Sequence, residues 1–161
     1  MGLTKRLPWP DGFHPYVADR KAKVVVRVSP AGKFVANFAT VNAERLASNA
    51  FDDVAMIDRD SKSVVIVDRD GRTLARIPQK GPAWQFDDPA DLAFDALGHL
   101  YVLDGRHAAI HVFAPNQRLV TTITSPVRQP GSIQRPRALA IDSAGRLYVF
   151  DESSRRIQVY Q

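Results

Sequence analysis

Cysteine is absent from the 161-residue sequence, which excludes disulfide bonds and thiolate-bound metal ions. Long apolar runs are absent too, so no segment approaches the roughly 20 residues that a helix needs to cross a bilayer. The first residues lead into Pro8, Trp9 and Pro10 rather than into an apolar stretch, so no signal peptide is expected. Sustained helical periodicity is also missing, which leaves short extended segments as the main structural signal. The compartment stays unknown.

The composition is that of a folded globular domain. Hydrophobic residues make up 45% and charged residues 24%, a balance that supports a buried core and argues against disorder. The 11 prolines and 9 glycines are spread along the chain, which indicates frequent turns between short elements. The net charge of +5 permits attraction to nucleic acid, anionic lipid or acidic protein, but it identifies none of them.

An internal repeat is the strongest feature of the sequence. Four segments each contain a short apolar stretch that ends on an aspartate, and a second apolar stretch begins six residues after that aspartate. We call these residues the marker aspartates: Asp19, Asp58, Asp104 and Asp151. Apolar pattern, turn residues and spacing all recur together, so the chain is interpreted as four copies of one structural unit.

Each unit is predicted to hold four short antiparallel strands, a to d in chain order. Residues 95–98 and 142–145 have the Asp-x-x-Gly pattern of a hairpin between strands a and b, because aspartate caps such a turn and glycine tolerates a positive φ. Residues 29–32 and 68–71 are assigned to the hairpins between strands c and d. Four such strands per unit are typical of a β-propeller blade. The predicted fold is therefore all-β, one propeller domain with about four blades, at approximately residues 5–38, 44–77, 90–123 and 137–161.

The unit from Pro89 to Phe113 reads Pro-x-x-Leu-Ala-Phe-Asp, then Gly-x-Leu-Tyr-Val-x-Asp, then Ile-x-Val-Phe, and it recurs with small changes from Pro136 to Tyr160. This pattern resembles the NHL-repeat family of β-propellers. The resemblance covers nearly the whole chain and implies the fold, whereas propellers host many unrelated activities.

The two end units depart from the pattern. The first lacks a convincing strand a, because Pro8 and Pro10 cannot donate to a ladder, and the last stops after strand c. Propellers of the NHL type usually close with six blades, so an incomplete ring is expected. Three explanations stay open: a fragment of a longer propeller, a ring completed by a second copy, or a small or open ring. Open strand edges invite pairing, so a homo-oligomer is one expectation.

The sequence contains few candidate catalytic or metal-binding residues. His107 and His111 have the spacing of two metal ligands on a helix, but an extended chain holds them about 13 Å apart. Asp68 and Asp70 resemble the start of a calcium loop whose later ligands are missing, and the marker aspartates fit a backbone-capping role. Neither a Gly-x-Ser-x-Gly nucleophile motif nor a phosphate-binding glycine loop is present. We expect no metal, no cofactor and no enzymatic activity.

The b–c and d–a loops share one face of a propeller, which we call the loop face, and the a–b and c–d hairpins share the opposite hairpin face. The loop face carries a slight excess of positive charge and the hairpin face a slight excess of negative charge. Aromatic and arginine side chains dominate interface hot spots. The candidate binding residues on the loop face are Arg59, Trp84, Phe86, Arg106, His107, Arg128, Arg135 and Arg155.

The leading functional hypothesis is a non-catalytic scaffold that binds a protein or peptide through the loop face. A first alternative is single-stranded RNA binding on the mildly basic face, which some NHL-like propellers perform. A second is a metal-dependent lactonase-like or lyase-like propeller enzyme, although no motif here matches the channel ligands of such enzymes. Insertion into a membrane is not expected, and the sequence leaves the partner's identity open.

Overall fold

The computed structural model describes residues 15–78, 86–124 and 132–160. Within these ranges the chain is all-β and forms four antiparallel sheets, as predicted. The first sheet contains β1 (Tyr16–Asp19), β2 (Val24–Val28) and β3 (Phe34–Ala39). The second contains β4 (Ala43–Ser48), β5 (Val54–Asp58), β6 (Ser63–Val67) and β7 (Thr73–Ile77). The third contains β8 (Pro89–Phe94), β9 (Leu100–Asp104), β10 (Ala109–Phe113) and β11 (Leu119–Thr124). The last contains β12 (Pro136–Ile141), β13 (Leu147–Asp151) and β14 (Arg156–Tyr160).

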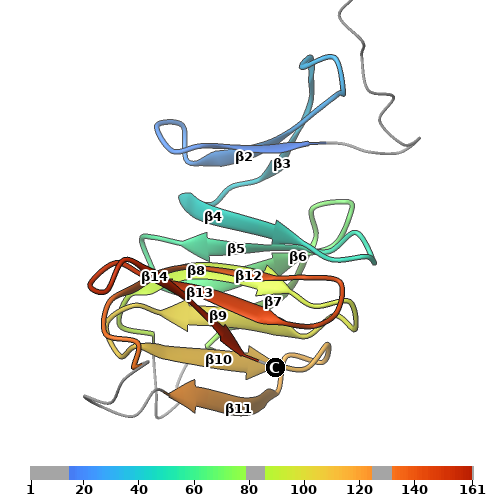
Figure 1. Cartoon of the computed structure of the whole chain (residues 1–161). Coiled ribbons are helices and arrows are strands. Elements are labelled where there is room, and N and C mark those ends of the chain that lie inside the picture. The colour runs from blue at the N-terminus through green and yellow to red at the C-terminus, as the bar shows by residue number, and fades with distance from the viewer. Residues whose placement is uncertain (1–14, 79–85, 125–131, 161) are drawn as a thin grey trace, which may run out of the picture.

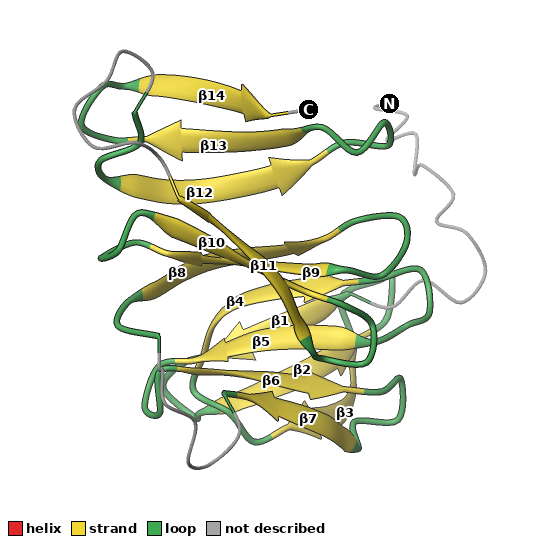
Figure 2. Cartoon of the chain, turned by 90° about the horizontal axis from the view of Figure 1, so that it is seen from below, coloured by secondary structure: helices red, strands yellow, loops and turns green. Residues whose placement is uncertain are grey.

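Each sheet is a simple meander in which strands adjacent in sequence pair with one another. The second and third sheets hold all four strands a to d, whereas the last holds a, b and c. The described part of the first sheet holds b, c and d, and the question of its strand a falls on residues 1–14, outside the described residues. The sheets contact one another in the order of the sequence, through β1 and β4, β4 and β8, and β8 and β12 (coloured in chain order in Figure 1). Figure 2 shows the sheet of β12–β14 beside that of β8–β11, with the sheet of β4–β7 beyond it.

Contacts between neighbouring sheets run mainly through their first strands, with β4 against β8 and β8 against β12. Among the described strands, no extensive contact joins the last sheet back to the first. The described strands therefore form a row of propeller blades with an open end, which agrees with the predicted incomplete ring. Whether a second copy covers that end stays a prediction.

The core consists of three clusters, one between each pair of neighbouring sheets. Successive side chains of a strand point to opposite faces, and Met56 and Ile57 on β5 are both buried because their sheet is covered on both sides. In the last sheet, buried and exposed side chains alternate instead. Val149 on β13 is fully buried against the third sheet, whereas Ile157 on β14 is 63% exposed because the far face of this sheet is uncovered.

The turns repeat as closely as the strands do. The four glycines assigned to hairpins, Gly32, Gly71, Gly98 and Gly145, all have positive φ, which confirms their predicted role. Asp52 and Gln117 take the same conformation in the two remaining described hairpins. The b–c turns have a left-handed residue four positions after each marker aspartate: Lys23, Lys62, Ala108 and Arg155.

Candidate binding face

The loop face is organised around the marker aspartates, and Asp104 shows the arrangement most fully. Its side chain is completely buried at the end of β9. One carboxylate oxygen accepts hydrogen bonds from the N–H groups of Arg106 and His107 in the b–c turn, at 3.1 and 3.3 Å. The carboxylate also accepts from the N–H groups of Asp87 and Asp88, just before β8, at 2.8 and 3.3 Å. A single carboxylate therefore fixes the b–c turn to the d–a loop.

Asp151 repeats this arrangement in the last blade. It is also fully buried, and it accepts hydrogen bonds from the N–H groups of Gln134 and Arg135 before β12. The Ser153 hydroxyl and the Ser154 N–H donate to its other oxygen from the b–c turn. The capping role predicted for the marker aspartates is thus confirmed at Asp104 and Asp151, since backbone N–H groups are their main partners.

The hydrogen bonds determine the charge state of these two groups. Burial acts to raise the pKa of Asp104, but the N–H of Asp87 and the ring and N–H of His107 outweigh it and hold the pKa below its usual value. The pKa of Asp151 is lowered in the same way, with burial opposed by Ser153, Gln134 and the neighbouring N–H groups. Both carboxylates are therefore ionised at neutral pH.

The other two blades satisfy the marker aspartate differently. Asp58 receives the guanidinium of Arg76 from β7 at 3.0 Å, together with the Ser61 hydroxyl. Asp19 is exposed and caps its turn through the Ala22 N–H at 2.9 Å. The loop face is accordingly held most firmly in the third and last blades.

Ion pairs link neighbouring loops across this face. Lys23 of the first b–c turn lies 2.8 Å from Asp60 of the second. Lys62 of the second b–c turn lies 3.7 Å from Asp87, which precedes the third sheet. Such exposed pairs contribute little stability each, about 0–1 kcal/mol, but they neutralise much of the positive charge on the face.

Five of the eight predicted binding residues lie on the described part of the loop face. Arg59 pairs with Glu44 at 2.9 Å, Arg106 with Asp87 at 2.9 Å, and Arg135 with Glu152 at 3.4 Å. The His107 ring contacts Asp104 through Nδ1 at 3.2 Å, and Arg155 holds the left-handed position of the last b–c turn. All five are exposed, and they lie in the b–c turns or directly before β12, at the same end of their sheets.

Phe86 requires a correction, because it is not a surface residue of the loop face. Its side chain is only 2% exposed and lies in the core between the second and third sheets. Its ring makes edge contacts with His111 at 5.5 Å and Phe113 at 6.3 Å. The apolar side chain gains more from this burial than from exposure beside an arginine cluster. Trp84 and Arg128 lie outside the described residues.

Two residues that organise the blades were missed in the sequence. Arg76 on β7 forms an ion pair with Asp58 on β5. The contact joins two strands that are not adjacent in the sequence, so the sequence pattern of either strand does not indicate it. Asp91 on β8 accepts the Leu139 N–H of the next blade at 3.0 Å and lies 3.6 Å from Arg45 of the preceding blade. The equivalent position in the last unit is Ala138, so the repeat carries no signal for Asp91.

The described residues contain no group of three or more histidine, aspartate or glutamate side chains placed to hold a metal ion. Asp68, considered as the start of a calcium loop, accepts the N–H groups of Asp70 and Arg72 at 2.9 Å and so caps a hairpin. The described part of the chain also contains no helix that could cross a membrane.

Comparison with known proteins agrees with this geometry. Residues 86–113 match the NHL repeat family model, the stretch that contains β8, β9, β10 and Asp104. NHL repeat-containing protein 3 of Homo sapiens is 31% identical over 85 residues, which cover 47% of this chain and 23% of that protein. Its Mus musculus counterpart is 29% identical over the same length. The match thus spans about a quarter of these relatives.

Solved structures extend the likeness to nearly the whole chain. A streptogramin B lyase has a TM-score of 0.67 at 11% identity, over 91% of this chain and 50% of that one. A catalytically inactive virginiamycin B lyase from Staphylococcus aureus with quinupristin has a TM-score of 0.67 at 12% identity, over 94% and 52%. The chain spans about half the length of these lyases, and identities this low show the fold alone. The chain is therefore an array of β-propeller blades that carries an NHL repeat.

Proposed function

We propose that the chain is a non-catalytic binding module that presents its loop face to a protein or peptide partner. The observation that carries the proposal is the double attachment of the loops by Asp104 and Asp151. A surface that is already ordered loses little conformational entropy when a partner binds, so more of the contact energy appears as affinity.

The side chains on this surface suit a partner of mixed polarity. Arg106 and Arg135 are more than half exposed, and each shares its carboxylate partner with a second basic residue. Their aliphatic stems offer apolar contact area, and their guanidinium groups are free to exchange one carboxylate for another. Arginine in this setting is a common anchor of protein interfaces.

The pairing of the basic residues favours a protein over RNA. Phosphate binding draws on cations that have no carboxylate beside them, whereas Lys23, Arg59 and Arg106 each have one within 3 Å. Binding of single strands also uses exposed aromatic side chains for stacking, and Phe86 is buried. Arg20, Lys21 and Arg156, which have no ion-pair partner among the described residues, lie in the first and last blades.

The test begins with selection of binding peptides from a random display library on the intact immobilised chain. Affinity of the selected peptides is expected to fall about tenfold or more in an Arg106→Ala, Arg135→Ala double variant. It is expected to stay unchanged in an Arg72→Ala, Arg118→Ala double variant, which removes two arginines from the hairpin face. Failure to select any peptide, or equal loss in both variants, would contradict the proposal.

Two further measurements separate the alternatives. Fluorescence anisotropy with a labelled oligouridine at about 50 and 200 mM salt is expected to show no binding. Tight binding that weakens steeply as the salt concentration rises would instead support single-stranded RNA as the partner. Metal analysis of the purified chain is expected to find no stoichiometric divalent ion. A bound ion, together with turnover of a lactone, would instead support the hypothesis of a metal-dependent propeller enzyme.

A further inference from the structure

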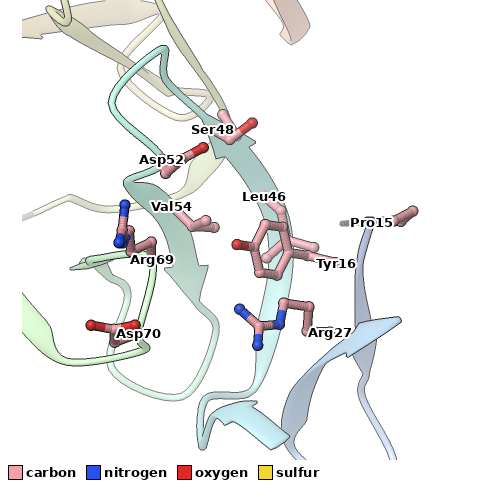
Figure 3. Close-up of a pocket in the computed structure, with 10 residues that line it drawn as sticks. Pro15, Tyr16, Arg27, Leu46, Ser48, Asp52, Val54, Arg69 and Asp70 are labelled. Carbon is pink, nitrogen blue, oxygen red and sulfur yellow. The ribbon is translucent and has the colours of Figure 1, made fainter. Parts of the chain in front are cut away.

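A pocket of about 550 Å³ opens on the hairpin face, between the first and second blades (Figure 3). Its size lies within the range of about 300–1,000 Å³ that is typical of small-molecule sites. Tyr16 and Arg27 line it from the first blade, and Leu46, Asp52, Val54 and Arg69 line it from the second. The pocket is therefore separate from the loop face and built from different residues.

Arg27 is the unusual residue of this pocket. It lies on β2 directly opposite Tyr16 on β1, and its guanidinium group is directed into the pocket (Figure 3). Its Nε is buried and has no hydrogen-bond partner among the described residues. A buried charged donor without an acceptor costs free energy, so the site favours an anion that can accept from this group.

Part of the wall consists of apolar and neutral polar groups. Leu46 and Val54 supply aliphatic surface, and the ring of Tyr16 is held in place by Phe38 at a centroid distance of 4.4 Å. Burial is the main cause that raises the pKa of Tyr16, while the Arg27 charge opposes it. The phenol therefore stays protonated at neutral pH and is available as a hydrogen-bond donor.

The charges around the pocket limit the kind of anion. Asp52 and Asp70 also line it, so a doubly charged phosphate would meet two carboxylates as well as the two guanidinium groups. A single carboxylate matches the planar fork of one guanidinium, and its charge is half that of a doubly charged phosphate. An apolar body attached to the carboxylate would cover Leu46 and Val54.

We infer that this pocket binds a small monocarboxylate with an apolar body, and that the Arg27 guanidinium donates hydrogen bonds to the carboxylate. The inference does not depend on the proposed function, because the two sites lie on opposite faces. Arg69 contributes a second, more exposed positive charge at the mouth of the pocket.

The test uses benzoate as the probe, with benzamide as a neutral molecule of the same shape and inorganic phosphate as the competing anion. The intact chain is labelled with ¹⁵N-arginine, and the Arg27 Nε–H resonance is assigned from its loss in Arg27→Gln. Benzoate is expected to shift this resonance saturably, and benzamide and phosphate are expected not to. Affinity for benzoate, measured by isothermal titration calorimetry, is expected to fall about tenfold or more in Arg27→Gln, as for the loss of a charge-assisted contact, and to stay unchanged in Arg118→Gln on a hairpin of the third blade.

Three outcomes would overturn the inference. They are the absence of any shift at about 10 mM benzoate, equal binding of benzoate and benzamide, and equal benzoate affinity in Arg27→Gln and the unmodified chain. Stronger binding of phosphate than of benzoate would replace the monocarboxylate by another ligand class. Calorimetry of benzoate against benzamide needs neither a substitution nor the Arg27 assignment, so it decides the matter even if Arg27→Gln fails to fold.

Discussion

Replacement of Asp104 by alanine tests how the loop face is held. The substitution removes the acceptor of four backbone N–H groups, two in the b–c turn and two before β8, at 2.8–3.3 Å. The site is completely buried, so water reaches the released N–H groups only if the turn opens. The expected result is a less stable chain whose b–c turn and d–a loop are no longer attached to each other.

The magnitude follows from the geometry of the four contacts. A well-formed hydrogen bond to a charged group contributes about 1.5–3 kcal/mol, and the contact to Asp87 at 2.8 Å is the only short one. The three longer contacts together contribute less to the free energy of unfolding than the sum of their separate values, because they share one carboxylate. The expected loss in Asp104→Ala is therefore about 3 kcal/mol of the free energy of unfolding. That is a large fraction of the stability of a typical domain, about 5–15 kcal/mol.

Asp19→Ala is the matched control, because the same marker position is exposed there and accepts one backbone N–H from its turn. Its expected loss is below about 1 kcal/mol. Urea unfolding followed by far-UV circular dichroism and by tryptophan fluorescence measures both variants. If Asp19→Ala destabilises the chain as much as Asp104→Ala does, the explanation by buried N–H groups is wrong.

Acid dependence provides a second measurement on the same residue. The folded-state pKa of Asp104 lies below the unfolded value near 3.9, so its stabilisation is complete above about pH 4 and is lost as the pH falls through the folded pKa. The difference in unfolding free energy between the unmodified chain and Asp104→Asn is expected to stay constant from about pH 7 to 5 and to shrink below about pH 4. A difference that grows as the pH falls below about 4 would show that the sign is wrong.

Two further pairs of variants test the packing of the blades. Gly71 and Gly145 both have positive φ, but a Cβ at Gly71 would collide with the carbonyl oxygen of Phe38 in the neighbouring blade, whereas a Cβ at Gly145 meets nothing within 4 Å. In urea unfolding, Gly145→Ala is expected to lower the free energy of unfolding by about 1 kcal/mol, and Gly71→Ala by at least about 2 kcal/mol more. Equal losses in the two variants would contradict the close approach of Gly71 to Phe38. Leu103 is fully buried between the third and last sheets and Leu97 is 71% exposed. Leu103→Ala is expected to lower the free energy of unfolding by about 2–5 kcal/mol and Leu97→Ala by less than about 0.5 kcal/mol, and a small effect at Leu103 would contradict the assigned core.

Much of the fold could be predicted because the repeat fixes it locally. The six-residue step after each marker aspartate leaves room for one tight turn, and the apolar stretches on either side pair as β5 with β6, β9 with β10 and β13 with β14. The hairpin glycines were equally informative, since positive φ is easiest for glycine. Asp52 and Gln117 escaped detection because their hairpins place a residue other than glycine at that position.

The candidate site was harder to predict because it depends on contacts between distant residues. Arg106 and Arg135 could be placed on one face from their position in the repeat, but their pairing with Asp87 and Glu152 could not. Phe86 was assigned to the surface because it precedes a strand in a long loop, and tertiary packing buries it. The pocket around Arg27 joins two blades, so no single repeat unit contains its pattern.

The central claim is that the loop face is the binding surface. Its most direct test is a map of backbone amide shifts in the ¹⁵N-labelled chain as a selected peptide is added. The expected result is a cluster of shifts in the b–c turns at residues 59–62, 105–108 and 152–155, with the hairpins at residues 68–71, 95–98 and 142–145 unchanged. Shifts confined to those hairpins would contradict the claim and would place the binding surface on the hairpin face.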